Sequence, residues 1–324
     1  MNRKLACVLG ASLVLAACGG DGESLFGEPP PSASFPISSS NGAAAVRVAW
    51  ESAGGSGALA GVGAGVGLSG SAPGAQTIAA QALSPEDIVI DVVSLLPFGP
   101  ETFGCAGGTG TAIISGNITN PETLSRDDTF RIEYDMCDDG AGTVTDGIVE
   151  MTIAEFTGDV FLGTFQVAAD TLVDSLSITA GGETITGSGD ARVTIDSTQA
   201  PFVSTGIYGN SLLQTTAVST GSLTNYASDL TYDGNQVPAE FAMGASGTID
   251  SSLLPGSIGY STEVTFAGIA GSYPNTGTLL VEGDKSTARL VAVDAENVRI
   301  DIDSDGDGTV DEMIEMTWDE LLNG

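Results

Sequence analysis

The chain has 324 residues, of which 9 are Lys or Arg and 42 are Asp or Glu, so its formal net charge is -33. A hydrophobic content of 42% excludes a disordered acidic tail, because such tails lack the apolar residues needed for a core. The chain contains no His, which excludes Ser-His-Asp catalysis, Cys-His catalysis and His-ligated zinc. The strong negative charge argues against nucleic-acid binding, because it would repel phosphate backbones.

The first 17 residues have the pattern of a secretory signal peptide. The basic pair Arg3-Lys4 precedes an apolar stretch of 13 residues, Leu5 to Ala17, which is too short to span a membrane as a helix. The stretch ends in Leu15-Ala16-Ala17-Cys18, which resembles the bacterial lipobox. The resemblance implies cleavage before Cys18 and acylation of its sulfur, so that acyl chains anchor the protein in a membrane. Because Gly19 and not Asp follows, it also implies the outer membrane.

Two segments precede the main body of the chain. We predict a tether over residues 18–40 and a partly helical, Gly/Ala-rich region over residues 41–100. The first contains Gly19-Gly20, Pro29-Pro30-Pro31 and scattered Ser, which is typical of a flexible tether between membrane and body. In the second we expect a helix from about residue 42 to residue 53, after N-cap side chains. A Gly/Ala-rich connector follows, and then a helix that begins at Ser84-Pro85 and is stopped by Pro97.

Two cysteines are left in the body of the protein. Cys7 leaves with the signal peptide and Cys18 is acylated, which leaves Cys105 and Cys137. Both flank predicted strands, and exported proteins form disulfides in their oxidising compartment. We therefore predict a Cys105–Cys137 disulfide, whose loop of about thirty residues contributes roughly 3 to 4 kcal/mol of stability in the chain-entropy model.

Residues 101–324 are predicted as one antiparallel β domain. Apolar and polar side chains alternate with a period of two, and turn signals such as Asp139-Gly140 and Asp233-Gly234 separate the runs. No long amphipathic helix separates them, so we expect a mainly β fold, a large antiparallel meander that forms a sandwich or a partly open barrel. The clearest apolar positions are Phe130, Ile132, Tyr134 and Met136; Val149, Met151 and Ile153; Ala191, Val193 and Ile195; Phe241, Met243 and Ala245; and Val298, Ile300 and Ile302.

An acidic segment at residues 301–312 resembles the D-x-D-x-D-G calcium loops of EF-hand and dockerin-like proteins. In the frame that starts at Asp303, the sharp turn falls on Gly308 and Ile314 replaces the usual glutamate at the twelfth position. A second frame starts at Asp301 and recovers Glu312, but it places a glycine where an apolar residue belongs, so we favour the first frame. The resemblance in that frame implies five ligands, which are Asp303, Asp305, Asp307, the Thr309 carbonyl and Asp311.

The flanks of this loop alternate like strands, which predicts the tip of a β-hairpin that carries a structural Ca²⁺ ion. Carboxylates packed this closely repel one another unless a hard cation compensates them. Thr317 and Glu320 are expected to cap a last helical turn through Leu322. The alternative is an ordinary turn, because Asp and Gly are both frequent in turns.

The lipobox, the two body cysteines and the terminal acidic loop together resemble a group of uncharacterised β-rich proteobacterial lipoproteins. The resemblance implies the cell envelope but no particular activity. We expect a non-enzymatic outer-membrane lipoprotein, stabilised by Ca²⁺, that acts as a structural module or binds a partner or an apolar ligand. The alternative is a calcium-dependent adhesion module that binds envelope polysaccharide. A carboxylate-based hydrolase using Asp127-Asp128 or Asp138-Asp139 has less support, because both pairs lie in predicted turns.

Overall fold

The structure is a computed structural model that describes most of the body of the chain. The described residues are 33–60, 99–105, 107–120, 123–140, 142–159, 163–180, 183–215, 219–270 and 272–323. The predicted signal peptide, Cys18, the Gly/Ala-rich connector from residue 61 onward and the predicted helix after Ser84 lie outside these residues.

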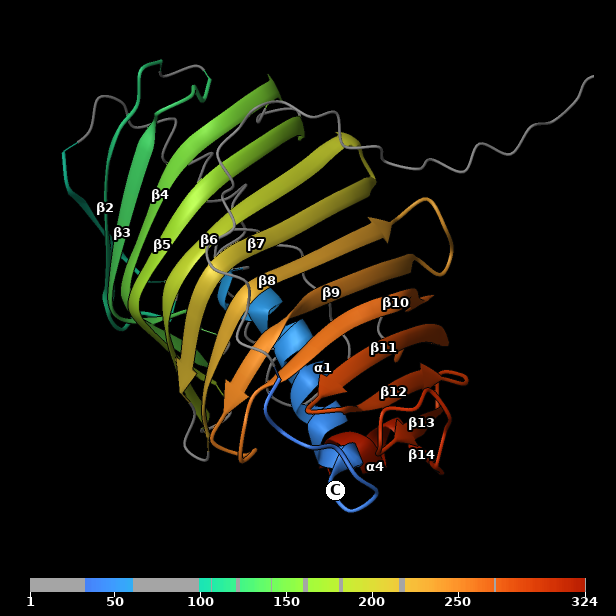
Figure 1. Cartoon of the computed structure of the whole chain (residues 1–324). Helices are drawn as coiled ribbons and strands as arrows, with labels where there is room; N and C mark the ends of the chain where they lie inside the picture. Colours follow the sequence, from blue (N-terminus) through green and yellow to red (C-terminus); the bar gives the residue numbers. More distant parts are fainter. Residues whose placement is uncertain are drawn as a thin grey trace, which may run out of the picture.

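Fourteen strands and two helices make up the described fold (Figure 1). Helix α1 spans Gly42–Ala60, and helix α4 spans Trp318–Asn323. The strands are β1 (Glu101–Gly104), β2 (Thr111–Asn117), β3 (Thr129–Asp138), β4 (Thr143–Asp159), β5 (Thr164–Ala180), β6 (Glu183–Gln199), β7 (Phe202–Thr215), β8 (Thr220–Asp233), β9 (Glu240–Ser251), β10 (Ile258–Ile269), β11 (Thr276–Gly283), β12 (Ser286–Ala292), β13 (Asn297–Asp303) and β14 (Glu312–Thr317).

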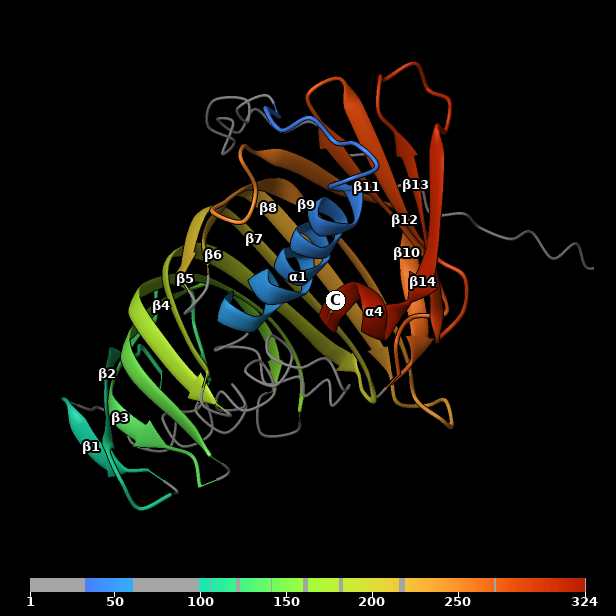
Figure 2. The same cartoon turned by 90° about the horizontal axis from the view of Figure 1, so that it is seen from below.

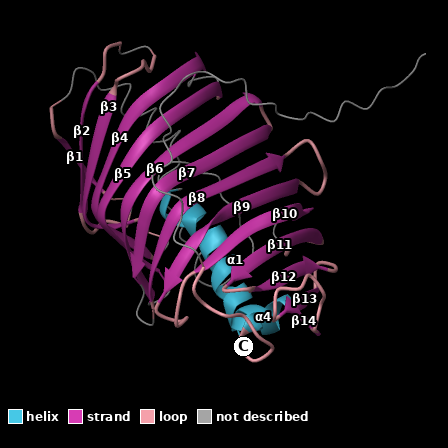
Figure 3. Ribbon diagram, in the orientation of Figure 1, coloured by secondary structure: helices cyan, strands magenta, loops and turns pink. Residues whose placement is uncertain are grey.

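Each strand pairs antiparallel with its neighbour in sequence, so the sheet is a single meander from β1 to β14 (Figure 3). The sheet is strongly curved but not closed, and β1 and β14 form its two edges (Figure 2). The predicted mainly β meander is therefore confirmed. Of the two expected forms, the curved open sheet corresponds to the partly open barrel, because the described strands form one sheet and not two packed layers.

The period-two pattern places the apolar side chains on the inner, concave face of the sheet. On β13, Val298, Ile300 and Ile302 are all buried, as the alternation predicts. On β3 the pattern fails at its last position, because Met136 is 57% exposed although Tyr134 is buried. The pairing of β3 with β4 shifts between Tyr134 and Cys137, and Met136 has a φ of 47°. This bulge turns the Met136 side chain outward, which sequence alternation alone does not reveal.

Helix α1 lies inside the curve of the sheet and packs against the strands from β6 to β13 (Figure 2). Its buried residues lie on several sides of the helix, because the sheet curves around it: Ala45, Val46, Val48, Ala49, Trp50 and Ala53. The helix continues to Ala60, beyond the expected end near residue 53. Gly54 and Gly55 therefore do not end it, since a glycine inside a helix costs only about 1 kcal/mol.

Four aromatic rings join α1 to the C-terminal end of the fold. Trp50 lies 4.6 Å from Phe266 of β10 and 4.9 Å from Trp318 of α4, measured between ring centroids. Tyr273 stacks on Trp318 with the ring centroids 5.5 Å apart. The Thr317 hydroxyl accepts the Glu320 backbone N–H, and the Glu320 carboxylate accepts the Thr317 N–H. The predicted cap of the last helical turn is thus confirmed.

Residues 33–38, which we call the N-terminal strap, bind to one end of the sheet. The Ser34 and Phe35 N–H groups donate to the Ser257 carbonyl at 3.0 and 3.1 Å, and the Phe35 carbonyl accepts the Asp284 N–H at 2.8 Å. Phe35 and Ile37 are 3% and 1% exposed. The sequence predicted a flexible tether up to residue 40. The structure differs from residue 33 onward, because these two apolar side chains are buried among strands that are distant in sequence.

Cys105 and Cys137 form the predicted disulfide, with their Cα atoms 5.4 Å apart. The bond joins the segment after β1 to β3, near one edge of the sheet. Backbone hydrogen bonds from Gly107 to Asp138 and from Asp138 to Thr109 support the same contact. The disulfide therefore fastens the short edge strand β1, which pairs through only four residues with β2.

We predict that Trp50→Ala destabilises the whole fold by about 3 to 5 kcal/mol, the usual range for removal of a buried aromatic side chain. The substitution removes the ring that contacts both β10 and α4. Urea unfolding followed by circular dichroism measures the loss. Leu253→Ala is the control, because Leu253 is 47% exposed and its truncation should change stability by less than about 0.5 kcal/mol. Equal losses in the two variants would contradict the central position of Trp50.

Candidate metal centre

The acidic segment forms the loop between β13 and β14. β13 ends at Asp303 and β14 begins at Glu312. The Asp311 N–H donates to the Ile302 carbonyl at 2.8 Å, which closes the hairpin where the two strands meet. Gly306 and Gly308 have φ angles of 73° and 86°, a backbone conformation that glycine adopts without strain. The loop is therefore the tip of a β-hairpin, as the strand-like flanks predict.

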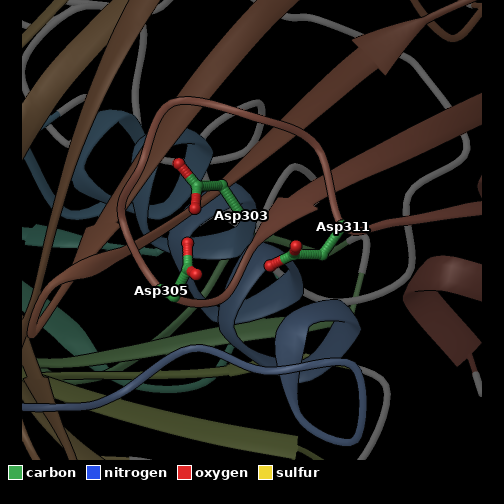
Figure 4. A group of neighbouring side chains, drawn as sticks. All are labelled: Asp303, Asp305 and Asp311. Atoms are coloured by element: carbon green, nitrogen blue, oxygen red, sulfur yellow. The ribbon is translucent and has the colours of Figure 1, made fainter.

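Three carboxylates converge inside this loop (Figure 4). Asp303, Asp305 and Asp311 each have a carboxylate oxygen within 4.8 Å of the oxygens of the other two. Asp303 is buried at the end of its strand, whereas Asp305 and Asp311 are exposed. Three negative charges at this separation repel one another, and a cation between them would remove that repulsion. The group could hold a metal ion with oxygen ligands.

Backbone hydrogen bonds hold the Asp303 carboxylate in place. Its Oδ1 accepts the Gly306 N–H at 2.7 Å, and its Oδ2 accepts the Gly308 N–H at 2.8 Å. A carboxylate oxygen has two lone-pair positions, so each oxygen keeps one for a cation. The glycines thus bend the loop around Asp303 and orient its carboxylate toward the centre.

Asp311 is held from the other side by Ser304. Its Oδ2 accepts both the Ser304 hydroxyl and the Ser304 N–H, the latter at 2.9 Å. Both hydrogen bonds stabilise the charged form and so lower the pKa of Asp311 below its ordinary value. The bond from the hydroxyl has the larger effect. Asp311 is therefore kept ionised, the form that binds a cation. This role of Ser304 was not predictable from the sequence, in which the residue is marked only by its place between two aspartates.

The expected ligands Asp307 and Thr309 are not part of the carboxylate group. The Asp307 Oδ1 accepts the Thr309 N–H at 2.7 Å, and the Asp307 N–H donates to Asp305 at 3.2 Å. Both residues therefore shape the loop, and ligation by the Asp307 carboxylate and the Thr309 carbonyl remains a prediction. The structure brings together the side chains of three of the five expected ligands.

The position of Asp301 favours the frame that starts at Asp303. The Arg299 guanidinium binds both oxygens of Asp301, with Nε–Oδ1 at 2.7 Å and Nη2–Oδ2 at 2.9 Å. Asp301 also pairs across the strands with Arg289. Asp301, the first ligand in the frame that starts at that residue, is thus bound by Arg299 on the sheet and lies outside the carboxylate group.

The loop rests on the turn between β11 and β12. A Cβ atom at Gly306 would lie 2.8 Å from the backbone carbonyl oxygen of Lys285. The same turn binds the N-terminal strap, since Ser286 accepts the Ile37 N–H at 2.7 Å and Asp284 donates to Phe35. The strap, the turn and the acidic loop therefore meet at one end of the sheet, an arrangement that local sequence patterns do not reveal.

Three of the four aspartates considered for catalysis accept backbone hydrogen bonds. Asp128 is fully buried, and its two oxygens accept the Thr119 and Ser125 N–H groups at 2.8 and 2.7 Å. Asp138 accepts the Gly140 N–H, and Asp139 accepts the Thr143 N–H. These contacts are typical of aspartates that stabilise turns.

We predict that Gly306→Ala destabilises the protein more than Gly308→Ala. Both substitutions place a side chain at a positive φ, which costs about 1 kcal/mol or somewhat more. Only the Gly306 Cβ meets a backbone atom, since a Cβ at Gly308 finds nothing within 4 Å. Urea unfolding in excess chelator should show a loss of about 1 kcal/mol for Gly308→Ala and at least twice that for Gly306→Ala. Equal losses would mean that the loop does not rest on Lys285.

No protein-family model, curated protein or solved structure matches this chain. Among the described helices, neither combines the length and the apolar character needed to cross a membrane.

Proposed function

We propose that the protein is a non-enzymatic, Ca²⁺-stabilised structural or binding module of the bacterial cell envelope, anchored in the outer membrane by acylated Cys18. The observation that carries the proposal is the convergence of Asp303, Asp305 and Asp311 within one hairpin loop. The anchor is supported by the sequence alone, through the lipobox-like tetrad before Cys18.

The donor set supports calcium as the ion. Three carboxylates supply only hard oxygen atoms, which suit Ca²⁺. Ca²⁺ takes six to eight oxygen ligands in flexible geometry, so backbone carbonyls such as that of Thr309 and water molecules would complete the shell. Mg²⁺ demands a tighter octahedron, which a long glycine-rich loop with two exposed carboxylates suits less well.

The position of the group supports a structural role for the ion. Asp303 ends β13 and Asp311 directly precedes β14, so an ion between them would fasten the two strands at the hairpin tip. The other end of β14 leads directly into α4, whose Trp318 contacts Trp50 of α1. Calcium would thus secure the C-terminal edge of the sheet and, through it, the aromatic contacts of α1.

The packing of α1 bears on what the protein could bind. The helix lies on the inner face over β6 to β13, so the fold uses that apolar surface for its own helix. Storage of an apolar ligand against the inner face of β6 to β13 consequently has less support than a structural role or binding through the outer surface.

A second candidate, a calcium-dependent module that binds envelope polysaccharide, is favoured by the exposure of the loop. Asp305, Asp307 and Asp311 are exposed beside the end of the sheet, where an ion would keep coordination sites open to hydroxyl groups. Calcium-dependent retention on immobilised cell-wall or outer-leaflet polysaccharide would support this candidate, and equal retention with chelator would remove it.

We predict that Ca²⁺ raises the thermal unfolding temperature and that chelator lowers it. A ligand that binds only the folded state stabilises it by about 2.7 kcal/mol at a hundredfold excess over Kd. Asp303→Asn and the double variant Asp305→Asn/Asp311→Asn should remove most of the shift, because they neutralise the converging carboxylates. Scanning calorimetry of the full chain with Ca²⁺, Mg²⁺ or chelator makes the measurement.

Asp250→Asn is the matched control, because it removes one exposed negative charge from β9, far along the sheet. This variant should keep the full calcium shift. An unfolding temperature that Ca²⁺ leaves unchanged in the unsubstituted protein would refute the calcium-stabilised module.

A further inference from the structure

The outer face of β4, β5 and β6 carries an exposed leucine set among carboxylates. Leu172 is 50% exposed, and it points away from the inner face that buries Thr171 and Val173. Glu150 and Asp190 lie directly opposite it on the two neighbouring strands. Asp170 and Asp174 flank it two residues away on its own strand and therefore share its face. An apolar side chain is thus bordered by carboxylates on four sides.

Arginines neutralise only part of this charge. Arg192 binds both oxygens of Asp170, at 2.7 and 2.8 Å, and Arg131 binds Glu150 at 3.2 Å. Among the described residues, the contacts of the other two carboxylates come from neutral donors. Asp174 accepts the Ser175 hydroxyl at 3.1 Å, and Asp190 accepts the Asn210 N–H and side-chain amide at 3.3 Å. The patch therefore carries an excess of negative charge close to an apolar side chain.

An exposed aromatic ring extends the patch onto β7. Tyr208 lies directly opposite Arg192, is 40% exposed and donates its hydroxyl to Asp229. A Cβ atom at Gly206 would lie 2.8 Å from the Tyr208 Cε2, so the ring lies along the strand over this glycine. The ring therefore adds flat apolar area beside the charged groups, where a cation can approach its face.

We propose that this outer patch, formed by Glu150, Asp170, Leu172, Asp174, Asp190, Arg192 and Tyr208, docks a cationic amphipathic segment of a partner protein. Lysine and arginine side chains combine an apolar stem with a positive end. On this surface the stems and neighbouring apolar side chains would cover Leu172 and the Tyr208 ring, and the positive ends would reach Asp174 and Asp190. Complementary charge also speeds the encounter of such partners, and a net charge of -33 favours cationic ones.

The inference goes beyond the proposed function and does not depend on it. The patch lies on β4 to β7, whereas the acidic loop joins β13 and β14 near the opposite edge of the sheet (Figure 1). Chelator should accordingly leave peptide binding intact at temperatures where the protein stays folded. Failure of calcium binding and failure of this docking surface can therefore be observed separately.

The test uses two synthetic peptides of equal charge, one of Lys and Leu and one in which Ser replaces every Leu. Fluorescence anisotropy of the labelled peptides with the full chain at physiological ionic strength measures Kd, where screening over about 8 Å leaves mainly local charges effective. We expect the Lys/Leu peptide to bind at least about tenfold more tightly, because only this peptide buries apolar area on the patch.

Two pairs of variants separate the patch from diffuse attraction. Leu172→Ser should weaken Lys/Leu binding by about fivefold or more, whereas Leu213→Ser should leave it unchanged. Leu213 is 45% exposed on the same face, but its cross-strand neighbours are Ser188 and Ser222. Asp174→Asn/Asp190→Asn should weaken binding about tenfold, and Glu240→Gln/Asp250→Asn on β9 by less than about twofold.

Unchanged circular dichroism and thermal unfolding establish that each variant is folded. Equal affinity for the two peptides, or equal weakening in patch and control variants, would overturn the proposal, because binding would then reflect only the overall negative charge. All six residues substituted in these four variants lie on exposed or half-buried positions, so folding should be preserved.

Discussion

A single curved sheet of fourteen strands has an inner face of apolar side chains that must be kept from water. Helix α1 meets this constraint over β6 to β13, where the sheet curves around it. Alanine at positions 45, 49 and 53 lets the helix approach the strands closely, and Trp50 reaches both β10 and α4. Over these strands the helix and the inner face of the sheet form a core, so the outer face can stay largely polar there. The acidic loop and the outer patch both depend on the sheet that it stabilises.

The end of the sheet that holds the acidic loop also receives the N-terminal strap. Both contact the β11–β12 turn, the loop through Lys285 and the strap through Asp284 and Ser286. In the proposed lipoprotein, the strap begins only fifteen residues after Cys18. A chain of that length spans at most about 50 Å, so the strap and the end of the sheet that holds the acidic loop would lie within that distance of the membrane surface. The outer patch on β4 to β7 lies toward the other edge.

Local patterns in the sequence predicted the strands well. The alternation in β13 and the D-x-D-x-D-G segment both describe neighbours along the chain. The first agrees with the structure, and three of the five ligands expected from the second converge. Features that depend on distant contacts were not predictable in this way. The burial of Phe35 and Ile37 requires Ser257 and the β11–β12 turn, more than two hundred residues away. The outward turn of Met136 requires a register shift between β3 and β4.

Native-state hydrogen exchange tests most directly whether the packing of α1 holds the sheet together. The amides of Ala45 to Trp50 and those of β8 to β12 should exchange at the same slow rate, through unfolding of the whole domain. Mass spectrometry of peptides covering these segments makes the comparison. Exchange of the α1 amides that is orders of magnitude faster, with β8 to β12 still protected, would contradict the account, because the sheet would then persist without its helix.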